Sequence, residues 1–198
     1  MYMEAFISLV LTTALLLGSP GPAPLALAGV GASFGFKGGM RFLSGILAGL
    51  LVVIFAVATG LGTLFTTYPL TKSICQFVGV AYLLYVAYKI ASAQGSIAER
   101  EGAAPSFKDG FILNLINPKA YAAFLAIFAN NLLILGDPLL SVIMTGVVCF
   151  AVAVIVDGLW MAIGGSLQTI FATPAQAKQL RLVCAAALLV SVISALTL

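Results

Sequence analysis

The sequence predicts an all-α integral membrane protein of six transmembrane helices. Of its 198 residues, 62% are hydrophobic and only 8% are charged, whereas soluble domains carry about 25% charged residues. The apolar residues gather in long runs, and Lys and Arg gather in alternate connections between those runs. Because a helix needs about 20 predominantly apolar residues to cross a bilayer, the length allows six spans and no separate soluble domain.

Each predicted span is an apolar run bounded by short polar segments. The six runs lie at residues 5–32, 40–65, 70–91, 110–135, 139–165 and 179–198. The segments between them contain most of the charge and much of the glycine and proline, which is typical of membrane-protein loops. The residues before the first run include the acidic Glu4 and no Lys or Arg. A signal peptide begins with positive charge, so we interpret that run as a span and not as a cleaved signal peptide.

The basic residues predict the orientation, because cytoplasmic loops carry an excess of Lys and Arg. Those in the odd-numbered connections or at the run ends that border them are Lys37, Arg41, Lys89, Arg100, Lys108, Lys178 and Arg181. The even-numbered connections and the run ends that border them contain only Lys72, and Lys119 lies within the fourth run. We therefore predict that both termini face outward and that residues 92–109 form a cytoplasmic loop.

Two of the six runs are interrupted at corresponding places. The first contains Gly-Ser-Pro-Gly-Pro-Ala-Pro at residues 18–24, and the fourth contains Asn-Leu-Ile-Asn-Pro-Lys at residues 114–119. Three helices separate these breaks, so we predict one membrane domain of two inverted three-helix repeats, at about residues 1–91 and 110–198. Paired broken helices of this kind indicate the binding site of a transporter.

The prolines of the first run cannot lie in one continuous helix, because each lacks an N–H and clashes with the carbonyl four residues earlier. Lipid cannot hydrogen-bond the freed backbone, so such a break must be buried in protein or line a wet cavity. Pro22 and Pro24 fit the start of a second half-helix, whose N-terminus attracts an anion such as a carboxylate. The alternative is a kink that only shapes packing.

The second break carries polar side chains. Pro118 predicts a free carbonyl at Asn114, and Asn114, Asn117 and Lys119 add amide and ammonium groups beside it. Lys119 has two interpretations. It snorkels to the cytoplasmic interface, or it contacts a substrate carboxylate or forms a gate ion pair.

Asp157 lies well inside the fifth run, where a carboxylate is costly and indicates function. It can hold a substrate ammonium or take up and release a proton, because burial favours the neutral acid. A static pair with Lys119 is the alternative, and Trp160, one turn further on, is expected to pack or to mark depth. The candidate substrate-binding residues are Ser19, Pro20, Gly21, Pro22, Asn114, Asn117, Pro118, Lys119 and Asp157, of which Asp157 is also the candidate for proton coupling.

Composition also argues against several classes of ligand. The chain has no histidine, and Cys75, Cys149 and Cys184 lie far apart, so we predict no metal site, no disulfide and no cofactor. A net charge of +3 with scattered basic residues does not predict nucleic-acid binding. The expected partners are a small-molecule substrate and membrane lipid.

Glycines at positions 31, 35 and 39, and at 45 and 49, recur every four residues. This spacing lets helix backbones approach closely. We interpret it as packing within the chain, with a homodimer face as the alternative.

The motifs Ser19-Pro20-Gly21-Pro22 and Asn117-Pro118-Lys119-Ala120, together with Asp157, resemble those of the LysE/RhtB family of amino-acid exporters. The similarity covers essentially the whole chain. It implies efflux of amino acids or close derivatives across a bacterial inner membrane, driven by the proton gradient and without enzymatic chemistry. Many members have a polar residue, often Asn, after Pro-Gly-Pro, where this chain has Ala23 and Pro24. Because no further intramembrane acid suggests a dibasic substrate, we expect a neutral one.

Two other functions are weighed against export. A passive channel, or a transporter of another small metabolite, would share the membrane architecture. A membrane thiol oxidoreductase would need two cysteines that meet at the breaks, and neither the first nor the fourth run contains a cysteine.

Overall fold

The structure is a computed structural model that describes residues 2–60 and 104–170, with single helical positions at 88, 179, 182, 183 and 186. Within these residues every regular element is a helix, and there is no strand. The predicted third and sixth spans, at residues 70–91 and 179–198, lie outside the described ranges apart from those single positions. The prediction of an all-helical protein is confirmed for the described part.

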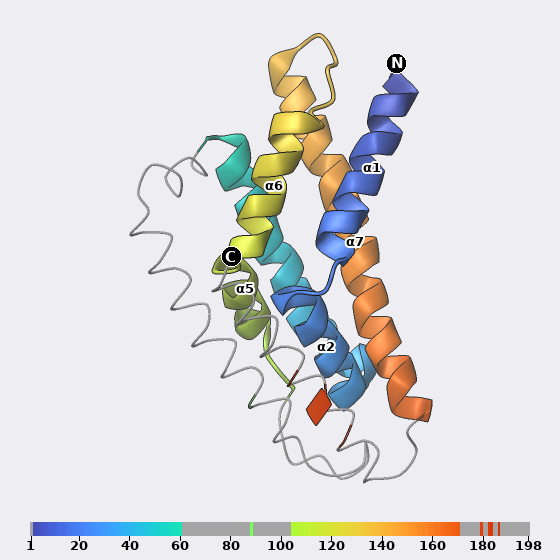
Figure 1. The fold of residues 1–198 in the computed structure, drawn as a ribbon. Helices are drawn as coiled ribbons and strands as arrows, with labels where there is room; N and C mark the ends of the chain where they lie inside the picture. Colours follow the sequence, from blue (N-terminus) through green and yellow to red (C-terminus); the bar gives the residue numbers. More distant parts are fainter. Residues whose placement is uncertain are drawn as a thin grey trace.

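The described helices pack against one another in a single bundle (Figure 1). They are α1 (Tyr2–Gly18), α2 (Pro22–Ala58), α5 (Phe107–Leu115), α6 (Pro118–Asn130) and α7 (Pro138–Ile170). Helix α2 and the Pro138–Ser166 part of α7 are each long and apolar enough to cross a membrane, and α5 with α6 passes the same test as a pair bent by 57°. The described part therefore contains two to three candidate spans.

The predicted break in the first run is present. Helix α1 ends at Gly18 and α2 begins at Pro22, with Gly21 as an extended N-cap. Proline is favoured at the first helical position, since its fixed φ suits the helix and its missing N–H would have no partner there. Residues 19–21 are therefore a non-helical link between two helices.

Helix α2 turns back on itself at Gly35, which has φ 70° and ψ 171°. Only glycine adopts this conformation readily. In a straight helix, residues 30 and 39 would be about 13.5 Å apart along the axis. Here a Cβ on Gly39 would lie only 3.0 Å from Cγ1 of Val30, so the chain reverses between them. Residues 22–34 and 36–58 therefore lie alongside one another (Figure 1), so Gly35, expected as a packing glycine, is instead the turning point.

Helix α5 begins at Phe107, three residues before the predicted start of the fourth span. Ser106 and Asp109 form a capping box, in which Asp109 Oδ2 accepts from Ser106 N at 2.7 Å and Asp109 N donates to Ser106 Oγ at 3.4 Å. A capping box satisfies backbone donors at a helix start. The last three residues of the predicted cytoplasmic loop are therefore helical.

Helix α6 ends at Asn130, five residues earlier than predicted. Residues 131–135 are not helical, and side chains of α7 accept hydrogen bonds from two of them. Leu133 N donates to Thr145 Oγ1 and Leu135 N donates to Ser141 Oγ, both at 3.0 Å. The chain thus leaves the helix to pack against the start of α7.

Glycines hold α2 against its neighbours within the chain. A Cβ on Gly31 would overlap the carbonyl oxygen of Met161 in α7, and a Cβ on Gly45 would overlap that of Phe107 in α5. On Gly49 it would lie 2.7 Å from the carbonyl oxygen of Phe111. Small residues permit this approach of backbones in membrane proteins, and the prediction of packing within the chain is confirmed at these three positions.

Candidate functional site

The two helix breaks face each other across the bundle. The ammonium of Lys119, from the first turn of α6, donates to the carbonyl of Ser19 at 2.5 Å and lies 3.5 Å from that of Pro20. A Cβ on Gly21 would lie 2.9 Å from Cδ and Nζ of Lys119. Glycine at this position therefore leaves room for the lysine side chain to reach the first break.

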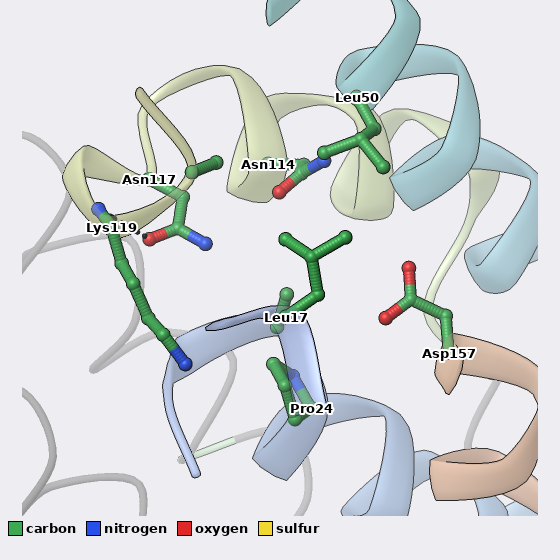
Figure 2. Close-up of a pocket in the computed structure, with 9 residues that line it drawn as sticks. Leu17, Pro24, Leu50, Asn114, Asn117, Lys119 and Asp157 are labelled. Carbon is green, nitrogen blue, oxygen red and sulfur yellow. Dashed lines mark hydrogen bonds between the residues drawn. The ribbon is translucent and has the colours of Figure 1, made fainter. Parts of the chain in front are cut away.

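A small cavity lies between the breaks and α7 (Figure 2). Its lining residues are Leu17, Ala23, Pro24, Leu50, Asn114, Asn117, Lys119, Ala120 and Asp157. The cavity has a volume of about 20 Å³, which is enough for about one water molecule. This volume is too small for an amino acid.

Asp157 brings a carboxyl group into this cavity from α7 (Figure 2). The residue is 5% exposed. Within the described part of the chain it has no hydrogen bond, and no cation lies within 4.0 Å of it; Lys119 attracts it from farther away. Buried polar groups normally have partners, so this carboxyl is an acceptor still open to a ligand, and the static pair with Lys119 is not formed.

Asn114 lies at the end of α5 and is 2% exposed. Its Nδ2 donates to the carbonyl of Ile46 in α2 at 3.0 Å, and its Oδ1 lies on the side of the amide away from Leu50 (Figure 2). The prediction that Pro118 frees the Asn114 carbonyl is wrong. That oxygen accepts from Asn117 N at 3.1 Å, because the chain tightens at the break.

Asn117 is the N-cap of α6. Its Oδ1 accepts from Lys119 N at 3.2 Å, and Pro118 occupies the first helical position. Asparagine is among the preferred N-cap residues for this reason. One of the backbone N–H groups at the start of α6 is thus satisfied by a side chain of the same Asn117-Pro118-Lys119 motif.

Aromatic side chains satisfy carbonyls at both breaks. Trp160 Nε1 in α7 donates to the carbonyl of Gly18 at 3.2 Å, and the Tyr121 hydroxyl donates to that of Leu115 at 3.0 Å. Backbone at membrane depth needs such partners. From the sequence we expected Trp160 to pack or to mark depth and did not foresee this bond, and we did not single out Tyr121. Each donor is more than four residues from its acceptor in the chain, so helix periodicity does not bring the two together.

The start of α2 offers few donors to an anion. Pro22 and Pro24 have no N–H, and the N–H of Leu25 donates to the carbonyl of Gly21 at 3.0 Å. Of the first four positions, only Ala23, which lines the cavity, has an N–H without a partner among the described residues. Any anion site at this half-helix therefore depends on one amide and the helix dipole.

The structure distributes the predicted site residues over three places. Asn114, Asn117, Lys119 and Asp157 line one cavity, whereas Ser19, Pro20 and Gly21 contact Lys119 outside the lining. Pro22 and Pro118 start half-helices. Sequence reasoning did not single out Leu17, Leu50 or Ala120 as lining residues, because an apolar residue in an apolar run carries no signal of which side it faces.

Long apolar helices, and two facing breaks with a small cavity between them, indicate a multi-pass membrane protein. Residues 14–197 match the family described as LysE type translocator. The chain belongs to this family.

Two curated relatives are described as homoserine/homoserine lactone efflux proteins, one from Salmonella typhimurium (strain LT2) and one from Salmonella typhi. Each is 29% identical over 161 residues, which cover 79% of this chain and 78% of the relative. No solved structure matches the chain.

Proposed function

We propose that this protein is a secondary transporter that exports a small neutral amino acid or a closely related zwitterion from the cytoplasm, coupled to the proton gradient. The observation that carries the proposal is the Asp157 carboxyl. It is buried and free of hydrogen bonds within the described residues, and it lies in a cavity between two helix breaks of a translocator-family protein. An intramembrane carboxyl in this setting is suited to a substrate cation or a proton.

The proposed architecture has six spans in two inverted repeats, at about residues 1–91 and 110–198, joined by the cytoplasmic loop at 92–109. Each described half supports it. In the first half, the broken helix formed by α1 and residues 22–34 is followed by the unbroken helix of residues 36–58. In the second half, the broken helix formed by α5 and α6 is followed by the unbroken helix α7. The distribution of the basic residues supports an orientation with both termini outside a bacterial inner membrane.

The proposed mechanism is alternating access about the two breaks. The substrate ammonium binds Asp157, and the substrate carboxylate faces Lys119 and the N–H of Ala23. Protonation of Asp157 removes the charge that holds the ammonium, so proton uptake from outside releases the substrate there. The closed cavity, with room for about one water molecule, fits an empty carrier between its two open forms.

The substrate class follows from the lining and from the relatives. The apolar lining residues Leu17, Leu50 and Ala120 suit a short uncharged side chain, and Asp157 is the one acidic lining residue in the part of the chain that the structure describes. The relatives export homoserine and its lactone according to their names. We therefore propose a substrate of about the size of homoserine that carries one ammonium group.

Efflux from preloaded cells tests this function. Cells that express the protein are loaded with labelled neutral amino acids, including homoserine, and release is followed with and without a protonophore. Selective release that stops when the gradient collapses is expected. Release that continues without the gradient would instead indicate a passive channel, and no release of any amino acid from cells with inserted protein would contradict the proposal.

A further inference from the structure

Helix α1 is held less tightly than the helices with which it encloses the cavity. Helix α2 is fixed against α7 and α5 by the close backbone approaches at Gly31 and Gly45. The one glycine of α1, Gly18, makes no such approach, because a Cβ there would lie 3.7 Å from Cγ1 of Val156, an ordinary van der Waals distance. Helix α1 can therefore move without breaking a backbone contact of this kind.

One stripe of α1 packs against the rest of the bundle. Leu9 and Thr13 are the only buried residues among positions 3–18, and Leu17 lines the cavity. Residues four apart lie on one face of a helix, so these three side chains form a single stripe that ends at the cavity. The polar contact within the stripe is weak, since Thr13 Oγ1 lies 3.5 Å from a cysteine sulfur, that of Cys149. A tilt of α1 would uncover the cavity along this stripe.

Side chains tie α1 to the bundle at both of its ends. At the first break, Trp160 and Lys119 donate to the consecutive backbone carbonyls of residues 18 and 19. At the other end, Asn131 Nδ2 donates to Ser8 Oγ at 3.0 Å. Asn131 directly follows α6, and the end of α6 lies at the same end of the bundle as the start of α1 (Figure 1).

We propose that α1 is the outer gate of the cavity, and that Asn131 is a positioning residue that keeps this gate closed through its bond to Ser8. The gate pivots on the non-helical residues 19–21, where two donors hold it in place. Hinges are typically a few residues at the end of such an element. The proposal rests on the proposed function, whose orientation puts the start of α1 outside, and it names the element that moves and the contact that breaks.

The neighbouring Asn130 provides a matched comparison for Asn131. Asn130 Nδ2 donates to the carbonyl of Ala126 at 2.9 Å, a bond within α6, whereas Asn131 reaches across to α1. Both bonds are exposed, so the loss of either one leaves no buried polar group without a partner. A difference between the two variants therefore reports the tie to α1 and not the stability of α6.

Cysteine labelling tests the gate without any transport measurement. In the full-length protein the three native cysteines are replaced by Ser, which keeps a partner for Thr13, and Ala120→Cys places one probe in the cavity lining. A membrane-impermeant maleimide is added outside intact cells, so the probe reacts when the cavity opens outward. Asn131→Ala should raise the labelling rate by about threefold to tenfold, as expected for the loss of one neutral hydrogen bond. Asn130→Ala should leave the rate unchanged.

A second probe detects general loosening of the bundle. Ile46→Cys serves this purpose, because Ile46 is fully buried where α2 packs against α5, and neither variant should raise its labelling rate. Equal labelling of the Ala120→Cys probe in the two variants would overturn the proposal, as would an equal rise at the Ile46→Cys probe. An increase seen only with a membrane-permeant maleimide would put the opening on the cytoplasmic side and would also overturn it. Absence of efflux in cells would contradict the proposed function and leave these labelling results to be judged separately.

A reversible cross-link provides the converse test. Ser8→Cys with Asn131→Cys, in the same background, is bridged by a short reducible bifunctional thiol reagent. The bridge should abolish efflux, because α1 can no longer leave α6, and reduction should restore it. Ala126→Cys with Asn130→Cys is the matched control, since residues one turn apart in a helix have Cβ atoms about 5–6 Å apart, and its bridge should leave efflux unchanged. Equal efflux from the two bridged proteins would refute the gate.

Discussion

The ammonium of Lys119 lies 2.5 Å from the carbonyl oxygen of Ser19, so one side chain joins two helix breaks that are 100 residues apart in sequence. The contact passes over Gly21, where a side chain would collide with the lysine. The two breaks are therefore tied together beside the cavity. Four predictions follow from this arrangement and from the packing around it.

Replacing Lys119 with Met should slow efflux by about tenfold or more, since a hydrogen bond to a charged group contributes about 1.5–3 kcal/mol. The change removes the link between the breaks and, among the described residues, the one basic side chain that lines the cavity. Efflux of labelled homoserine at equal protein level in the membrane measures the effect. Lys108→Met, an exposed change on α5, is the matched control, and equal rates in the two variants would refute a role for the link.

Asp157→Asn should insert and fold but lose efflux driven by an imposed pH gradient. Asn has nearly the same shape, yet it neither carries the charge that holds an ammonium nor exchanges a proton. Proteoliposomes with and without a pH gradient measure the coupling. Asp137→Asn is the control, because Asp137 is exposed and caps Leu140 N at 2.7 Å, a bond that Asn can also make. Gradient-driven efflux that survives in Asp157→Asn would rule out proton coupling through this residue.

Gly31→Ala should lower the thermal stability of the protein in detergent, because the new Cβ overlaps the backbone of α7 at Met161. Overpacking of this kind costs about 1–3 kcal/mol. Gly158→Ala provides a matched comparison in a helix, since nothing lies within 4 Å of the new Cβ there. It should be neutral or stabilising by up to about 1 kcal/mol. Melting temperatures in the reverse order would contradict the close packing of α2 on α7.

Replacing all three cysteines with Ala should preserve efflux. Cys149 is buried in α7, 3.5 Å from Thr13 Oγ1, and is not among the residues that line the cavity; Cys75 and Cys184 lie outside the described residues. A small loss of stability is expected from the shorter side chain at position 149. Complete loss of function in a stably inserted triple variant would instead favour the thiol oxidoreductase considered from the sequence.

The sequence by itself determined the all-helical membrane class, the two breaks and the burial of Asp157. These features are local. A run of apolar residues, a proline that lacks an N–H, or a carboxyl in the middle of a span has the same consequence whatever the neighbouring helices are. The family resemblance was also carried by short local motifs, and the match over residues 14–197 confirms it.

Tertiary structure alone decided which groups meet. Lys119 binds Ser19, Trp160 binds Gly18, and Asn114 binds Ile46, and each pair is separated by at least 68 residues. A hydrogen-bond partner is chosen by which helices pack together, and that choice depends on the close approaches at Gly31, Gly45 and Gly49. For this reason Asp157 could be recognised as unusual from its place in the chain, whereas its lack of a partner in the described structure followed only from the packing of the helices around it.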